Sequence, residues 1–544
     1  MRTQRAQLVV TGQVVVAAEA HGLETAEAIG IAGDRVVSTG TRAEVADAAD
    51  RSARIIDARD AAVIPGLHDF HVHLVGLART RNAIGLDDAA DGAEVAKRLA
   101  AAARRGAEDE WLTGRGWNER QLAGLEPGAL DAAAGEGLAL LTSHDGHSAW
   151  ASPRARRLAG LGAATADPPG GRLERDAAGE PTGILRETAM DLVAPLATRA
   201  QGEALHDALD ATLHELAGLG VTGASEAGDY TDANGIGADA PLGDSYSTLT
   251  DLGALVDGRL RLTLGIPADA IAVAAQRGLR TGAWLTERRT MRFGWAKEYA
   301  DGALGSGTAA LFEPRTCGSP DAGILRVTDD ELDALIAAAR PAGIGLAVHA
   351  IGDRAAAVVL DAIERAPARV ANVPHDRLEH AQLVRPQETE RFARLGVTAS
   401  VQPIHAAADR DLVEACWDGR QGRAYAWRSL RSAGALVAAG SDAPVESVNP
   451  WLGLFAAVHR RLPTDARGDW RPEQALTPIE ALSAYTLGPA RAIGAADEGH
   501  LRPGARADLA VLSGDLDTIL AADERLADVR AEVTIVDGRE IPMR

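Results

Sequence analysis

The middle of the chain alternates short apolar runs with alanine-rich stretches of helical character, and this alternation constrains the fold most. It is typical of βα units that build a parallel sheet. The predicted strands are 63–68, 138–143, 219–226, 259–265, 292–299, 344–350, 376–382, 396–402 and 435–441. Eight parallel strands can close a barrel, and the segment from about 78 to 200 is too long for one βα unit. We therefore expect an α/β fold, a (β/α)8 TIM-like barrel with a long insertion after its first strand, and we place 138–143 in that insertion.

Both ends of the chain have a different, strand-rich character. Short strands are predicted at 7–17, 26–32, 35–39 and 53–58, with a tight turn at Gly33-Asp34. The last forty residues contain one strand after Asp508 and a hairpin that turns at Asp537-Gly538. The expected domains are a small β-sandwich made from 1–61 and 498–544, and a barrel over 62–497 with its insertion at about 78–200.

Composition restricts the partners and the compartment. The net charge of −21 repels phosphate backbones, so a nucleic-acid partner is not expected. The apolar start of the chain alternates like a strand rather than a signal peptide, and no apolar stretch approaches the roughly 20 residues of a membrane span. Two cysteines, Cys317 and Cys416, fit a reducing compartment. We expect a cytoplasmic protein without a membrane partner.

The strongest chemical signal is Asp69-Phe-His71-Val-His73, which directly follows an apolar run. Residues two apart in a strand point to the same face, so His71 and His73 project together. They would emerge at the carboxyl end of a strand, where barrel enzymes carry their chemistry. Two imidazoles on one face suit Zn²⁺ or a similar divalent metal.

Four later predicted strands also end in residues that could bind metal, namely Lys297, His349, His380 and Asp442. Each has an ordinary alternative. A buried histidine often bonds to a backbone carbonyl, an aspartate can cap a helix or a turn, and a lysine can form a salt bridge. All four would emerge at one barrel rim together with the histidine pair, which favours a shared metal site.

These residues resemble the two-metal signature of the amidohydrolase superfamily of metal-dependent hydrolases, and the resemblance covers nearly the whole chain. Further phrases resemble its YtcJ-like branch, which includes N-substituted formamide deformylases. They are Gly116-Trp-Asn-Glu119, Asp145-Gly-His147-Ser-Ala-Trp150, Lys297-Glu-Tyr-Ala-Asp301-Gly302, His349-Ala-Ile-Gly-Asp353 and Glu379-His380.

The resemblance implies one or two divalent metal ions per chain, with zinc as the expected metal. His71 and His73 would hold the more buried ion, and His349 and His380 the second. Lys297, carboxylated by CO₂, would bridge them, a role that the always-charged arginine cannot fill. Only two of the 56 basic residues are lysines, so the retention of Lys297 fits this role.

The implied reaction is attack by metal-bound hydroxide, with Asp442 as general base and then general acid. Three further histidines, His144, His147 and His405, are candidates to polarise the scissile carbonyl. We expect the substrate to be a small N-acyl amine, such as an N-substituted formamide, and the enzyme to be a homodimer. Two alternatives stay open: a hydrolase of a cyclic amide, ester or carbamate on the same site, and a non-catalytic metabolite-sensing barrel.

Overall fold

A computed structural model describes residues 5–19, 21–81, 83–105, 111–126, 128–197, 202–228, 253–318, 320–367 and 373–542. Within this part of the chain eight parallel strands form a nearly closed barrel, in the order β18-β17-β16-β15-β14-β13-β12-β5. Their bounds are β5 Leu67–Val72, β12 Val221–Glu226, β13 Arg261–Pro267, β14 Met291–Tyr299, β15 Leu346–Ala350, β16 Arg377–His380, β17 Thr398–Val401 and β18 Val437–Ala439. The predicted barrel is confirmed.

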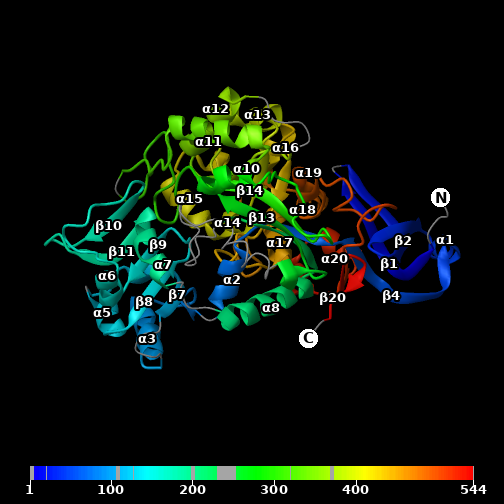
Figure 1. Ribbon diagram of the computed structural model, residues 1–544, viewed down its shortest axis with the longest axis horizontal. Coiled ribbons are helices and arrows are strands. Elements are labelled where there is room, and N and C mark those ends of the chain that lie inside the picture. Colours follow the sequence, from blue (N-terminus) through cyan, green and yellow to red (C-terminus); the bar gives the residue numbers. More distant parts are fainter. Residues whose placement is uncertain are drawn as a thin grey trace.

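Helices cover the outside of the barrel (Figure 1). The strands are buried along almost their whole length, which explains why they appear in the sequence as continuous apolar runs. The principal covering helices are α8 Gly202–Gly218, α11 Asp329–Ala342, α12 Asp353–Arg365, α13 Pro386–Leu395, α17 Pro450–His459 and α18 Pro478–Ala484. The predicted capping box at the start of α18 is present, since Thr477 and Glu480 bond to each other's backbone N–H groups.

Strands from both chain ends form one seven-stranded sheet, in the order β21-β20-β19-β4-β1-β2-β3. Their bounds are β1 Ala6–Glu19, β2 Gly22–Ala32, β3 Arg35–Gly40, β4 Ala49–Pro65, β19 Leu509–Leu512, β20 Ala531–Val536 and β21 Arg539–Glu540. Strand β4 lies between β1 and β19, so it joins the two ends of the chain. The sheet lies on the opposite side of the barrel from the insertion (Figure 1).

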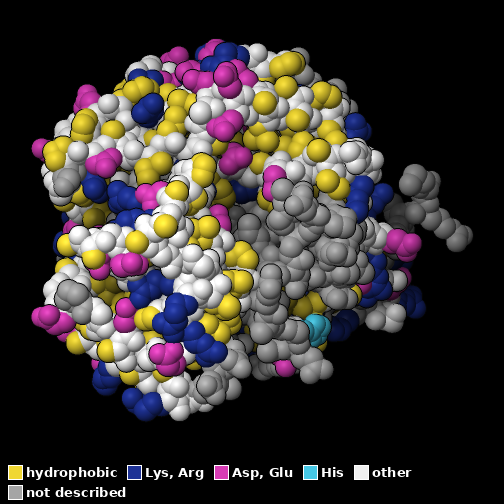
Figure 2. All heavy atoms as spheres, turned by 60° about the vertical axis from the view of Figure 1, so that its left-hand side comes forward, with side chains coloured by type: hydrophobic (Ala, Val, Ile, Leu, Met, Phe, Trp, Pro, Cys, Tyr) yellow, Lys and Arg dark blue, Asp and Glu magenta, His cyan; other side chains and the backbone are white. Residues whose placement is uncertain are grey.

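The insertion contains a separate six-stranded sheet, in the order β10-β11-β9-β8-β7-β6. Its strands are β6 Ile84–Gly85, β7 Trp111–Trp117, β8 Leu138–Ser143, β9 Ser148–Ala151, β10 Gly171–Arg175 and β11 Pro181–Glu187. Alternate residues of β8 enter different cores, with Leu138 and Leu140 on one face and Ala139 and Leu141 on the other. Acidic and basic side chains are interspersed over the face that this part of the molecule presents (Figure 2).

Three expectations need correction. The predicted strand 63–68 is divided between β4, which ends at Pro65 in the terminal sheet, and β5, which begins at Leu67 in the barrel. The predicted loop 163–182 contains β10, whereas the predicted loop 231–243 lies outside the described residues. Cys317 and Cys416 form a disulfide rather than two free thiols, because the loop after β14 returns to the end of α15 (Arg410–Cys416).

No helix among the described residues has both the length and the apolar character needed to cross a membrane.

Candidate metal centre and active site

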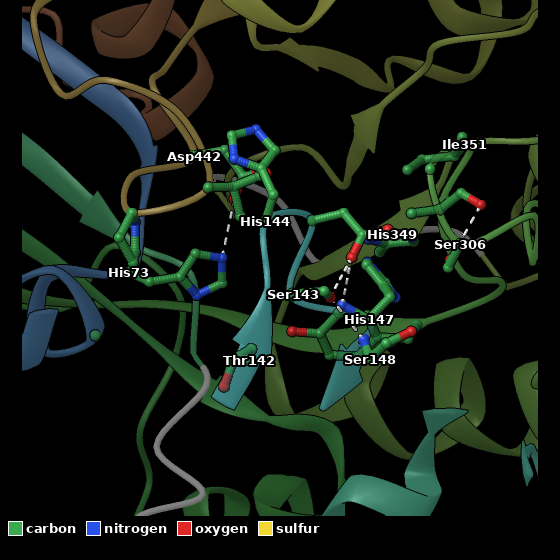
Figure 3. Close-up of a pocket in the computed structure, with 18 of the residues that line it drawn as sticks. His73, Thr142, Ser143, His144, His147, Ser148, Ser306, His349, Ile351 and Asp442 are labelled. Carbon is green, nitrogen blue, oxygen red and sulfur yellow. Dashed lines mark hydrogen bonds and ion pairs between the residues drawn. The ribbon is translucent and has the colours of Figure 1, made fainter. Parts of the chain in front are cut away.

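The predicted site residues gather around a cavity of about 980 Å³ at the carboxyl ends of the barrel strands. Loops of the barrel form one side of this cavity and the insertion forms the other. Figure 3 shows His73 beside Asp442, and His147 of the insertion beside His349.

The seam between the first and last barrel strands holds the centre of the site. The backbone N–H of Asp442 donates to the His71 carbonyl (2.7 Å), and that of His73 donates to the Ala443 carbonyl (2.9 Å). Asp69 strengthens the seam by accepting hydrogen bonds from the backbone N–H (2.9 Å) and hydroxyl (2.6 Å) of Ser441. Gly440 permits this approach, because a Cβ atom there would lie 2.3 Å from the His71 nitrogen.

Asp442 lies between two pairs of histidines. Its Oδ1 is 3.0 Å from Nε2 of His73 and 3.3 Å from Nε2 of His71. Its Oδ2 is 3.0 Å from Nε2 of His405 and 4.0 Å from Nδ1 of His380. Burial favours the protonated acid, but the neighbouring histidines outweigh it and hold the pKa of Asp442 well below its ordinary value. The carboxylate is therefore ionised, with one oxygen directed at each pair.

Buried ring nitrogens in this cluster fit a metal ion. Nε2 of His71 is buried without a hydrogen-bond partner, while Nδ1 of the same ring bonds to the buried carboxylate of Glu379. Nδ1 of His380 bonds to Gln402 (2.8 Å), and burial holds the pKa of His380 well below its ordinary value, so its ring is neutral. A carboxylate that bonds to the far nitrogen of a ligating imidazole is the usual support of a metal site.

Two groups of side chains bring their ligand atoms within 4.8 Å of one another: His71, His73 and Asp442, and His380, His405 and Asp442. Imidazole and carboxylate together are a donor set typical of zinc. Asp442 belongs to both groups.

The structure places His349 and Lys297 at the same cavity but in neither group. The His349 ring lies 4.5 Å from the His380 ring, and its Nε2 bonds to the Gly302 carbonyl (3.1 Å). The Lys297 amine lies 4.5 Å from the centre of the Tyr299 ring. Lys297 is buried, and no carboxylate in the described part of the chain pairs with it, so the salt bridge considered as its ordinary role is absent there.

The three additional histidines have different surroundings. His144 lies at the edge of the insertion, 3.0 Å from Asp87 and 3.4 Å from Glu446. His405 lies between Asp442 and Glu446; burial would lower its pKa, but hydrogen bonds to these carboxylates raise the pKa to about 10. A charged His405 fits a catalytic role beside Asp442 better than a ligand role. His147 bonds to Glu187 of the insertion (2.9 Å).

Sequence analysis missed the carboxylates and the amide that hold these histidines, namely Glu187, Glu379, Gln402 and Glu446. Glu379 offered a signal, because a glutamate inside a buried strand next to a candidate ligand needs a partner. That partner is Arg377, which bonds to Glu379 and stacks on the Phe70 ring at 3.8 Å. Glu187 and Glu446 lie far in sequence from the histidines they contact, so spacing gave no indication of them.

Comparisons with known proteins agree with this architecture. The amidohydrolase family model matches residues 54–542. YtcJ of Bacillus subtilis (strain 168) is 33% identical over 496 residues, which cover 89% of each chain. N-substituted formamide deformylase of Arthrobacter pascens is 28% identical over 564 residues, which cover 98% of each chain. The crystal structure of a metal-dependent hydrolase from Pyrococcus horikoshii has a TM-score of 0.74 at 26% identity, covering 93% of this chain and 97% of that one.

A match of this extent, on a barrel with this site, establishes that the chain belongs to the amidohydrolase family and is a hydrolase that acts on carbon–nitrogen bonds.

Proposed function

We propose that this enzyme hydrolyses the C–N bond of a small N-acyl amine, with an N-substituted formamide as the leading substrate class. The observation that carries the proposal is the ionised Asp442, placed between two histidine groups at the bottom of the cavity. A cavity of about 980 Å³ accommodates a small organic amide. The similarity to N-substituted formamide deformylase over 98% of both chains supports the acyl group.

His71, His73, His380 and Asp442 would hold one or two divalent ions, with zinc as the proposed metal and His349 as a further ligand. A bound metal would lower the pKa of a water molecule and polarise the scissile carbonyl. Lys297 supports the two-ion version, because it is buried at the cavity without a carboxylate partner among the described residues. Carboxylation by CO₂ would convert this amine into an anionic ligand.

Asp442 is the group that moves the proton. Its ionised carboxylate can accept a proton from the attacking water and later deliver it to the departing nitrogen. His405 donates to Oδ2 and keeps that oxygen directed into the cavity. Formyl and acetyl groups are small, so the amine part of the substrate would fill most of the cavity between the barrel and the insertion.

The test combines metal analysis with a matched substrate panel. Protein purified without chelator is analysed by ICP-MS and then assayed for amine or alcohol release from N-butylformamide, N-butylacetamide, δ-valerolactam and butyl formate. We expect two equivalents of metal, hydrolysis of the acyclic amides, loss of activity with chelator and recovery with Zn²⁺.

Other outcomes each overturn a stated part. A single equivalent of metal removes the bridging role of Lys297. Turnover of the lactam or ester alone shifts the function to cyclic amides or esters. Failure to bind any divalent metal after reconstitution rejects the mechanism.

A further inference from the structure

Glu187, the last residue of β11 in the insertion, is buried and accepts hydrogen bonds from three different parts of the molecule. The donors are Nδ1 of His147 (2.9 Å), the hydroxyl of Thr308 (2.6 Å) and the guanidinium of Arg326 (3.2 Å). Its backbone N–H also bonds to the His147 carbonyl (3.0 Å). Glu187 has a φ of 51°, an uncommon conformation for a glutamate, which indicates that its surroundings determine its position.

These contacts determine which nitrogen of His147 carries a proton. Burial opposes ionisation, but His147, Thr308 and Arg326 together hold the pKa of Glu187 below its ordinary value. An ionised carboxylate can only accept hydrogen bonds, so Nδ1 of His147 must be the donor. Its Nε2 then faces away from Glu187, and among the described residues no side chain or backbone group hydrogen-bonds to that atom. His147 lines the cavity, with its ring 5.2 Å from that of His349.

This arrangement distinguishes His147 from the other two candidate histidines. His144 uses one ring nitrogen for Asp87 and the other for Glu446. His405 likewise faces Asp442 with Nε2 and Glu446 with Nδ1. Of the three, only His147 has a ring nitrogen left for a substrate.

Glu187 also contacts the loop that supports His349. Thr308 lies in the loop after β14, and Gly302 in the same loop accepts the hydrogen bond from Nε2 of His349. A Cβ atom on Gly302 would lie 2.2 Å from Oε1 of Glu187, so the carboxylate packs directly on this backbone. One side chain of the insertion thus contacts both His147 and the support of His349.

We propose that Glu187 is a positioning residue for the hydrolysis: it orients His147 with the proton on Nδ1 and leaves Nε2 to hydrogen-bond the reacting amide group. His147 is then the substrate contact that the insertion contributes to a site otherwise built by the barrel. The inference rests on the proposed function for the identity of the substrate, but the orientation of His147 can be measured without any substrate.

The first experiment reads the proton position directly. The enzyme is labelled with ¹⁵N-histidine, and the His147 signals are assigned by their loss in His147→Gln. In wild-type enzyme we expect Nδ1 of His147 to carry a proton. Glu187→Gln keeps the side-chain size but can present its amide NH₂ to Nδ1, so the proton should move to Nε2. An unprotonated Nδ1 in the wild type, or an unchanged pattern in Glu187→Gln, overturns the proposal.

The second experiment measures turnover of N-butylformamide, or of whichever acyclic amide in the panel is hydrolysed. Glu187→Gln should lower kcat about 10- to 100-fold, as for loss of a group that orients a site residue, with metal content unchanged. Combining it with His147→Gln should add little to the effect of His147→Gln alone, because the two residues act together. Multiplicative effects would show that Glu187 has only a structural role.

Glu174→Gln is the matched control. Glu174 lies on β10, beside β11, and bonds to Arg186 (2.7 Å), which directly precedes Glu187. The variant weakens the same hairpin without touching His147, so its kcat should stay within about twofold of wild type. A comparable loss in both variants overturns the proposal. If the wild type hydrolyses no member of the panel, the proposed function fails, and the ¹⁵N experiment still decides the role of Glu187.

Discussion

At the scale of single residues, the backbone of Asp442 allows a clean test of its chemistry. Its φ of 60° lies in the left-handed region, which aspartate and asparagine tolerate better than most residues. Asp442→Asn should therefore fold normally and keep the N–H bond to His71, yet lose the proton acceptor. We expect kcat to fall about 10²–10⁴-fold, the usual contribution of a general base. Steady-state kinetics and the urea unfolding midpoint give the answer. A large drop in that midpoint would instead indicate a structural role.

Gly440 provides a second residue-scale prediction. A Cβ atom there would lie 2.3 Å from the His71 nitrogen and 2.8 Å from Oδ1 of Asp69. Gly440→Ala should cost about 1–3 kcal/mol of unfolding free energy, as overpacking does, and should lower the metal content by displacing His71. Gly422→Ala serves as the control, because its Cβ would enter open space. Equal behaviour of the two variants in unfolding and ICP-MS would contradict the prediction.

The candidate ligands could be found from the sequence because they follow apolar runs, and the carboxyl ends of parallel strands meet at one rim. Their partners could not be found in this way. Glu446 lies close in sequence to Asp442, but its contacts with His144 and His405 depend on how the insertion docks against the barrel. Docking depends on tertiary packing, which leaves no local periodic signal.

At the scale of elements, the strand predictions succeeded where a helix separates two strands and failed where no polar break exists. The apolar run from Ala62 to Leu67 serves two sheets in succession, and the change occurs at Gly66. A Cβ atom at Gly66 would lie 1.9 Å from the Thr222 hydroxyl. The change of sheet therefore depends on close contact with a distant strand, which the local sequence does not reveal.

The disulfide between Cys317 and Cys416 ties the loop after β14 to α15, across 99 residues. In the chain-entropy model, a closed loop of this length contributes about 4–5 kcal/mol to stability. We expect dithiothreitol to lower the urea midpoint of the native enzyme. The double variant Cys317→Ser, Cys416→Ser should have the lower midpoint from the start and no response to the reductant. An unchanged native midpoint would show that the bond adds no stability.

The contact of Glu446 with His144 fastens the insertion to the barrel, and it predicts a pH dependence. Burial alone would raise the pKa of Glu446, but hydrogen bonds to His144 and His405 lower the pKa to about 2. An acid whose pKa is depressed on folding adds stability above its ordinary pKa near 4.5 and loses it as the pH falls toward 2.

Glu446→Gln cannot titrate, so its stability difference from wild type should narrow on acidification. The linkage predicts a narrowing of about 2 kcal/mol between pH 7 and pH 3. Urea unfolding of both proteins, each stripped of metal, measures this difference. A gap that stays constant with pH would mean that Glu446 is not ionised by these contacts.

At the scale of the whole molecule, three sheets share one chain. The terminal sheet joins both chain ends through β4, the barrel supplies most of the site, and the insertion covers the cavity from the other side (Figure 1). The division into barrel and additions followed from the number of apolar runs and the length of the segment at 78–200. The approach of the insertion to the cavity did not, because the residues that make the contact come from both partners.

The bond between the Asp442 N–H and the His71 carbonyl has a consequence for biosynthesis. The first histidines of the site leave the ribosome early, but the strand that completes the barrel, and Asp442 behind it, leaves late. A nascent or prematurely terminated chain lacking β18 has neither a closed barrel nor its proton acceptor. The cell is thereby spared unregulated amide cleavage by unfinished copies, since only a chain translated past the last barrel strand can become active.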